Sequence, residues 1–291
     1  MLLSDLKNLK SALTEIPKTS PEYPKEWLAL SDSPEKLYAL GDVRLLSARK
    51  FAVVGSRRTP TAISKFGIEL CKELSYSFVL VTGTADGGDS AVIEGALSGS
   101  GKAICLLAGG FSALPQGNLA LLEKVAKRGL LLSPYPFETE TRAFSYEYRN
   151  KLLASLCEGA AVLSAGEKSG ALITAKYAEK YGKPVFSVPY SPNSAAGTGC
   201  NALLKKGARL IECAADVLQV FGIEKDSVRK QIALSQDEQK LYQALQDLGE
   251  SHISALSQKS GVAAFKARAV LSALEVKGLA VGVGGNRYTI V

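Results

Sequence analysis

Residues 51–60 combine a short apolar run with a glycine, a serine and two adjacent cations. The run leads into Gly55, Ser56, Arg57 and Arg58, and the following Thr-Pro pair is typical of the start of a helix. A buried strand that feeds a helix N-terminus collects unpaired N–H groups and the positive end of a helix dipole. Arginine adds a forked cation that binds phosphate well. The segment therefore predicts a phosphate site, and the alternative is an ordinary strand–helix turn with two solvated arginines.

A second segment, residues 142–151, mixes aromatic rings with cations. Tyr146 offers a ring on which an unpaired base can stack, while Arg149, Asn150 and Lys151 can bind the phosphate backbone. These residue types are those that bind single-stranded nucleic acid. The same helix is also expected to pack one face into the core, through a stripe at helical spacing formed by Tyr148, Leu152 and Leu156.

Apolar strand-like runs alternate with helical patterns from residue 51 to about residue 221. The predicted strands are 51–54, 78–82, 103–107, 130–132, 159–164 and 185–188. The predicted helices are 61–76, 89–98, 118–128, 147–156, 173–181 and 200–206. Alternation with uniformly apolar strands predicts the α/β class, with a doubly wound and mostly parallel sheet. In such sheets, ligands bind outside the carboxyl ends of the strands.

The positions just after these strands carry the remaining candidate residues. Gly83 follows the second strand, Gly110 follows the third, and Lys168, Ser169 and Gly170 follow the fifth. Glycine lets the backbone turn sharply or approach a ligand, although turn geometry alone can explain it in any single loop. Several such loops on one sheet edge, two of them with cations, favour a ligand site. The N–H groups expected to support Arg57 are those near Gly55, Ser56 and Gly110.

The chain offers few groups for catalysis or for metal binding. Its five cysteines are scattered and never spaced as C-x-x-C, and its single histidine, His252, lies far from the glycine loops. Asp86 and Asp89 could bind magnesium, but a role in turns and helix caps is favoured. We therefore expect no catalytic residue, no metal and no cofactor, and hence a protein that is not an enzyme.

The composition of the 291 residues is that of a globular protein, with 46% apolar residues and a formal net charge of +7. The positive charge mildly favours a polyanionic partner. No apolar run approaches the roughly 18 residues of a membrane span, and the N-terminus lacks the pattern of a secretory signal. The expectation is a cytoplasmic protein that does not bind a membrane.

Three domains or segments and one linker are predicted. Residues 1–45 are expected to be a helical or irregular lead-in, residues 46–222 the main domain, and residues 223–234 a polar linker. Residues 235–291 show three short helical patterns and a hairpin with a Gly-Gly-Asn turn, which predicts a small winged-helix domain. Its third helix carries only Lys266 and Arg268 as a basic face, so duplex DNA and protein partners both stay open.

Taken together, these motifs resemble the DprA/Smf family of DNA-processing proteins over roughly residues 23–220. Residues 52–57 match the first phosphate loop of the family and residues 83–97 follow its second motif in spacing. The later motifs are matched by residues 149–151, 168–175 and 189–208. The chain departs from the family at Asp86, where arginine is usual, and at Ile93, where histidine is usual.

The resemblance implies an extended Rossmann-like domain and a homodimer. It also implies a protein that binds incoming single-stranded DNA during natural transformation, protects it and helps to load the RecA recombinase. Neither catalysis nor a cofactor is implied. Two alternatives remain open: a nucleotide or sugar-phosphate hydrolase that uses the same glycine loops, and a transcription regulator that acts through the winged helix.

Overall fold

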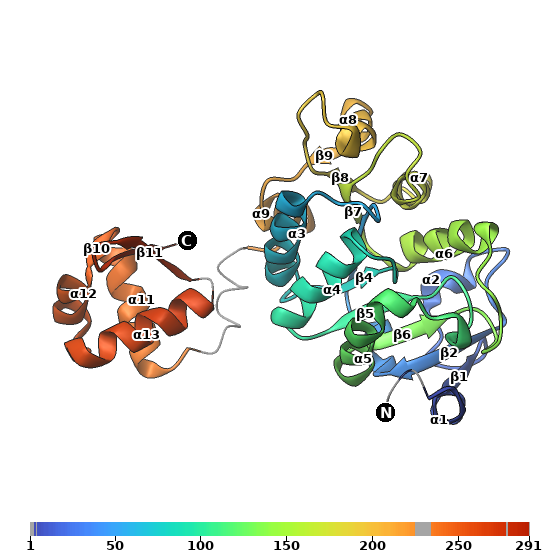
Figure 1. The fold of residues 1–291 in the computed structure, drawn as a ribbon, viewed down its shortest axis with the longest axis horizontal. Coiled ribbons are helices and arrows are strands. Elements are labelled where there is room, and N and C mark those ends of the chain that lie inside the picture. Colours follow the sequence, from blue (N-terminus) through green and yellow to red (C-terminus); the bar gives the residue numbers. More distant parts are fainter. Residues whose placement is uncertain (1–2, 4, 225–233, 278, 291) are drawn as a thin grey trace. The chain divides into compact units, whose positions relative to one another are not determined.

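The computed structural model describes residues 3, 5–224, 234–277 and 279–290. The chain divides into two units, Met1–Lys225 and Asp226–Val291, which Figure 1 colours from blue to gold and from orange to red. Most of the predicted polar linker, residues 225–233, lies outside the described residues.

The first unit is built on a nine-stranded sheet in the part of the chain that the structure describes. Its strands are β1 (Thr14–Pro17), β2 (Lys36–Gly41), β3 (Lys50–Gly55), β4 (Val79–Thr82), β5 (Ala103–Leu106), β6 (Leu130–Ser133), β7 (Ala160–Ser164), β8 (Val185–Ser187) and β9 (Arg209–Leu210). All six strands predicted from apolar runs are present. The residues of β4, β5, β6, β7 and β8 are all buried, as expected for strands covered on both faces.

The strand order is β1-β2-β6-β5-β4-β3-β7-β8-β9, from blue β1 at one end of the sheet to gold β9 at the other in Figure 1. Pairs from β6 to β9 are parallel, and only β1 and β2 are antiparallel to their neighbours. The central order β5-β4-β3-β7-β8-β9 is that of a Rossmann-like sheet. The chain winds in opposite directions from β3 and β7, so the crevice between these two strands is where such a fold binds ligands.

The expectation of a helical or irregular lead-in over residues 1–45 was wrong for two segments. β1 and β2 pair with each other, and β2 continues the main sheet by pairing with β6. Only one residue of β1 is buried, and β2 has three buried residues, with exposed residues at both of its ends. The edge strand β1 therefore lacks the continuous apolar run that identifies a central strand. β2 has a short apolar run at residues 37–40 between Lys36 and Gly41, which was not assigned to a strand.

Helices cover both faces of the sheet. They are α1 (Leu6–Ser11), α2 (Lys25–Leu28), α3 (Thr61–Leu74), α4 (Gly88–Ser98), α5 (Leu119–Arg128), α6 (Ala143–Leu156), α7 (Ala171–Lys180), α8 (Thr198–Lys205) and α9 (Ala214–Leu218). In β6, Leu130 and Leu132 pack in one core cluster with residues of α6, α7 and α8, whereas Leu131 packs in another with residues of α4 and α5. The doubly wound expectation is met.

An aromatic cluster closes the amino end of the sheet. The Phe51 ring is fully buried and lies 5.5 Å from that of Phe78 and 5.8 Å from those of Phe186 and Phe221. Phe51 thus joins β3 to β8 and to the segment that ends the first unit.

The second unit contains α11 (Gln236–Leu248), β10 (Ser251–His252), α12 (Ile253–Ser260), α13 (Ala264–Val276), β11 (Ala280–Gly284) and β12 (Arg287–Ile290). Gly285 and Asn286 have φ angles of 58° and 57° at the hairpin turn, as a two-residue turn with both central residues left-handed requires. The sequence missed β10, which has two residues and pairs with β12. No helix among the described residues is long and apolar enough to cross a membrane.

Replacement of Phe51 by alanine should lower the free energy of unfolding by about 3–5 kcal/mol, because it leaves a cavity between several rings. Urea unfolding followed by circular dichroism measures the change. Phe144→Ala is the matched control: its ring is 64% exposed, and a change within about 0.5 kcal/mol is expected. Equal losses in the two variants would contradict the assignment of Phe51 to the core.

Candidate nucleic-acid interface

A pocket of about 330 Å³ lies at the carboxyl ends of β3 and β7, where the strand order reverses. The loops after these strands, the loop after β4 and one side of α6 surround it. Most of the candidate residues line it: Gly55, Ser56, Arg57, Gly83, Tyr146, Arg149, Asn150, Ser169 and Gly170. The fold thus brings together segments that lie more than a hundred positions apart in the sequence.

A second pocket, of about 290 Å³, adjoins the first. It is lined by the loops after β4 and β5, including Gly110, and it shares Arg57, Ala85 and Tyr146 with the first pocket. The two pockets together form a track along the carboxyl edge of the sheet.

Arg57 and Tyr146 stand at the boundary of the two pockets. The Arg57 guanidinium carbon lies 5.3 Å from the centroid of the Tyr146 ring, which is within the range of a cation–π contact. Arg57 is exposed and the Tyr146 side chain is partly so. A phosphate can therefore reach the cation, and a base can reach the ring when Arg57 swings away from it.

Arg149 lies at the floor of the first pocket and is only 5% exposed. Its Nη1 donates to Leu106 O at 2.9 Å, and its charge attracts the carboxylate of Asp89, which is 4% exposed. Burial raises the pKa of Asp89, and the attraction of Arg149 opposes that shift. Burial likewise lowers the pKa of Arg149. The two residues form a buried pair of opposite charges that joins α4 to α6.

Two glycines at the site make room for close packing. A Cβ at Gly83 would overlap Arg149 Nη1 and Asp89 Oδ2, so this position must stay small for the charge pair to form. A Cβ at Gly55 would lie 2.8 Å from Gly88 Cα, where the start of α4 crosses the end of β3. Packing inside the protein therefore accounts for both glycines.

Ser56 belongs to a hydrogen-bond network with β7. Its N–H donates to Ser164 O at 2.9 Å, and its hydroxyl lies 3.0 Å from Ser164 Oγ, which in turn is 2.6 Å from Thr59 Oγ1. The Gly110 N–H donates to Thr139 O at 2.8 Å. These N–H groups are engaged within the chain, so they do not form the backbone cradle that the sequence suggested.

The N-terminus of α7 points at the first pocket, because Gly170, Ala171 and Thr174 all line it. Asn150 Nδ2 donates to Gly170 O at 3.1 Å and so ties this helix end to α6. Two buried polar atoms here have no hydrogen-bond partner among the described residues: Thr174 Oγ1 and Arg149 Nε. A helix N-terminus with unpaired donors beside it is suited to an anion.

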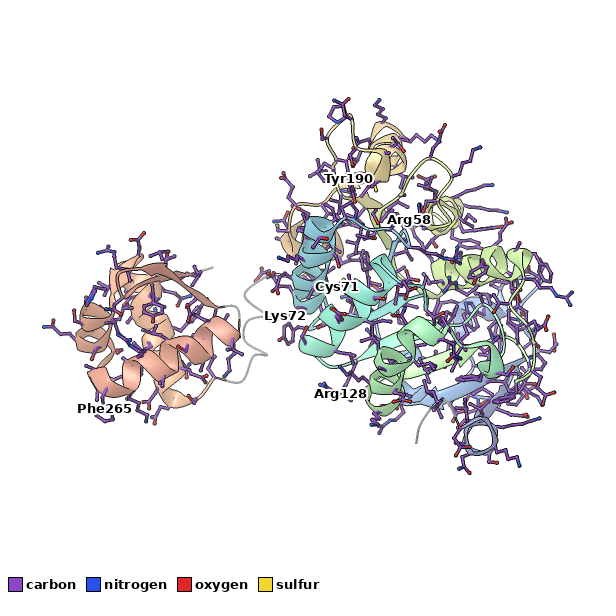
Figure 2. The ribbon with its side chains drawn as sticks, in the orientation of Figure 1. Arg58, Cys71, Lys72, Arg128, Tyr190 and Phe265 are labelled. Atoms are coloured by element: carbon purple, nitrogen blue, oxygen red, sulfur yellow. The ribbon has the colours of Figure 1, made fainter. Side chains whose placement is uncertain are left out.

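Three candidate residues line neither pocket: Arg58, Lys151 and Lys168. Arg58 and Lys168 are exposed near the rim, and Figure 2 marks Arg58 on the loop that leads into α3. Lys151 instead forms an ion pair with Asp32, and its side chain is only 18% exposed. Pairing with a residue of the N-terminal segment could not be foreseen from the pattern of residues 142–151.

The sequence did not single out Thr174 as a site residue. Its signals were its place in the matched motif of residues 168–175 and in the first turn of a helix that begins just after Gly170. Asp86 lines the second pocket and Asp89 the first, whereas Ile93 is fully buried in the core. The apolar residue at position 93 therefore contributes to packing and not to the site.

Groups suited to metal binding are sparse. No cluster of three or more His, Cys, Asp or Glu side chains that could hold a metal ion occurs within the described residues. His252 caps α12, where its Nδ1 accepts from Ser254 N at 3.2 Å.

Comparison with known proteins finds relatives over most of the chain. A model of the family described as DNA recombination-mediator protein A matches residues 15–222. The DNA processing protein DprA of Bacillus subtilis is 36% identical over 214 residues, which cover 72% of this chain and 72% of the relative.

Two solved structures share the fold. The X-ray structure of DNA processing protein A from Streptococcus pneumoniae superimposes with a TM-score of 0.69 at 31% identity, covering 74% of this chain and 77% of that one. A Helicobacter pylori structure, described by its single-stranded DNA binding mode, has a TM-score of 0.65 at 31% identity and covers 72% and 95%.

Removal of either member of the buried charge pair should be strongly destabilising. Asp89→Ala and Arg149→Met should each lower the free energy of unfolding by roughly 3–5 kcal/mol, because each leaves an uncompensated buried charge. The double variant should lose clearly less than the sum, and a double-mutant cycle from urea unfolding measures the difference.

The exposed pair Lys10–Glu138 supplies the control, with side chains 58% and 75% exposed. Glu138→Ala should leave stability essentially unchanged. Additive losses for Asp89 and Arg149 would rule out a direct interaction between their charges.

Proposed function

The chain belongs to the DNA recombination-mediator protein A family, and on that premise we propose that it binds single-stranded DNA. The observation that carries the proposal is the pair of adjoining pockets that share Arg57 and Tyr146. A cation beside an aromatic ring supplies what a single strand needs, because phosphates follow the charge and bases stack on the ring. The Helicobacter pylori relative, described by its single-stranded DNA binding mode, supports the same ligand.

In this proposal a phosphate occupies the first pocket. Arg57 neutralises it from the exposed side, while the positive end of α7 and the Thr174 hydroxyl face it from below. Ser56, Ser169 and Gly170 complete the wall, and Tyr146 stacks on an adjacent base. Arg58 and Lys168 attract the strand from the rim.

Arg149 and Asn150 act as positioning residues in the same scheme. Arg149 shapes the floor through its contacts with Asp89 and Leu106, and Asn150 fixes the N-terminus of α7. Gly55, Gly83 and Gly110 keep the loops close enough to enclose the strand. Lys151 contributes long-range charge at most, because Asp32 pairs with it.

The wider role that we propose follows the family. The protein binds incoming strands during natural transformation, protects them and helps to load the RecA recombinase, acting in the cytoplasm as a homodimer and without catalysis. Family membership supports this role, and the relatives named as DNA processing proteins agree with it.

We also propose that the second unit is a winged-helix domain that contacts a protein. Four of its cations pair with acidic side chains: Lys259 with Asp247, Lys266 with Asp237, Lys277 with Glu238, and Arg287 with Glu250. Arg268 donates to Asn286 Oδ1 at 2.8 Å. Cations already engaged in this way are weak ligands for DNA phosphates.

A nucleotide or sugar-phosphate hydrolase has less support. It would need a carboxylate at the sheet edge that is free to transfer a proton. In the first pocket, Asp89 accepts from Ala85 N and is drawn to Arg149, while Glu147 accepts from the Tyr177 hydroxyl at 3.3 Å. Asp86 in the second pocket is exposed, but it is the single carboxylate among the lining residues of that pocket, and hydrolysis uses both a general acid and a general base.

Arg57→Ala should weaken binding to labelled oligo-dT about tenfold or more, because it removes the cation shared by both pockets. The slope of affinity against salt should become shallower, since fewer counterions are released. Fluorescence anisotropy at several salt concentrations measures both effects.

Arg128→Ala is the matched control. Arg128 ends α5, which precedes β6 and so lies at the amino edge of the sheet; Figure 2 marks it far from Arg58. This variant removes the same charge and should leave binding within about twofold. Unchanged affinity in Arg57→Ala would exclude Arg57 from the binding site.

Deletion of residues 226–291 should leave affinity for oligo-dT within about threefold of that of the full chain, because both pockets lie in the first unit. Anisotropy with the truncated protein, after its fold is verified by circular dichroism, tests this expectation. Loss of binding in a folded truncation would instead favour a regulator that acts through the second unit.

A further inference from the structure

We propose that the second pocket holds a base of the bound strand and that Asp86 makes it select guanine. The inference rests on the proposed function and concerns the sequence preference of the same track. It follows from the shape of this pocket, its position beside Tyr146 and the chemistry of its lining.

The pocket combines an apolar lining with a cation and an aromatic ring at its border. Its apolar lining includes the buried Leu107 and Ala108 together with Pro115, while Arg57 and Tyr146 border it on the side of the first pocket. Its volume of about 290 Å³ lies at the small end of the range for ligand pockets. A base next to a phosphate held in the first pocket would enter it directly.

Asp86 is the acidic side chain among the lining residues of this pocket. It is exposed, and within the described residues it has no hydrogen bond or ion pair. It does not cap α4 either, since the N-cap of that helix is Gly87. A Cβ at Gly117 would lie 3.3 Å from Asp86 Oδ1, so the carboxylate sits next to Gly117, two residues after the pocket-lining Pro115.

The carboxylate of Asp86 disfavours a phosphate in the second pocket and favours a base that offers N–H donors. It repels phosphate, which directs the phosphate to the first pocket. An ionised carboxylate only accepts hydrogen bonds, and its two oxygens pair best with two adjacent N–H donors. Guanine presents such a pair on its Watson–Crick edge, at N1 and at the 2-amino group.

The other bases match less well. Thymine has a single N–H donor between two carbonyl oxygens, and those oxygens would face the carboxylate. Adenine and cytosine each offer an amino group beside a ring nitrogen acceptor. The expected order of preference is therefore guanine first and thymine last, with Tyr146 stacking on whichever base is bound.

Anisotropy with two labelled strands tests the preference: oligo-dT, and the same strand with one central guanine. The native protein should bind the guanine strand more tightly, on the order of tenfold, near the low end of what one bidentate base contact provides. A third strand with hypoxanthine in place of guanine lacks the 2-amino group and should lose most of that gain. Equal affinity for the guanine and thymine strands would overturn the proposal.

Two variants test whether the preference for guanine arises in the second pocket. Asp86→Asn should bring the ratio of the two affinities close to one, because the amide presents a donor to one of the guanine donors. Glu94→Gln removes a charge from an exposed position on α4 outside both pockets and should keep the full ratio. A preserved ratio in a folded Asp86→Asn protein would overturn the proposal.

Free guanosine monophosphate, titrated as a competitor, distinguishes a base within a strand from a free nucleotide. It should fail to displace the labelled guanine strand, and displacement at low concentration would overturn the assignment to a strand. Failure of the proposed function looks different, since the protein would then bind neither labelled strand.

Discussion

The attraction between Asp89 and Arg149 is the constraint on which the candidate site depends. Removing either charge from water costs several kcal/mol, and only a partner with well-placed hydrogen bonds offsets that cost. Here the partners are each other, Leu106 O for the arginine and the Ala85 N–H for the carboxylate. The pair fixes α4 against α6, and it requires a glycine at position 83. It therefore holds the loop after β4 beneath the aromatic segment that carries Tyr146.

Two exposed groups lie above the floor that Asp89 and Arg149 form: the guanidinium of Arg57 and the ring of Tyr146. Their contact separates a first pocket, with a helix N-terminus, unpaired donors and the carboxylates of Asp89 and Glu147, each engaged by a neighbour, from a second pocket with the exposed carboxylate of Asp86. A nucleic-acid strand alternates charged phosphates with neutral bases, and two neighbouring pockets with different linings match that alternation. The track thus suits a strand better than it suits an isolated anion.

The central strands were predictable because each contains an uninterrupted apolar run, as at residues 79–81 and 130–132. β1 and β9 were missed because edge strands are short and exposed, so burial leaves little trace in their sequence. β2 was also missed, although it pairs with β1 on one side and with β6 on the other. The loop that carries Arg57 could be proposed as a phosphate site from the types and order of its own residues. Arg149 and Lys151 have the same residue types as DNA contacts, yet one is buried with Asp89 and the other is paired with Asp32.

The sequence by itself determined where the six predicted strands lie, the α/β class, and the resemblance to a family that processes DNA. Only the tertiary structure decided that β7 lies beside β3, which places Ser56 next to Ser164 and turns the start of α7 toward Arg57. It also decided which cations are free and which are paired. The physical reason is that periodicity and propensity act over a few residues, whereas burial and charge pairing depend on neighbours distant in the chain.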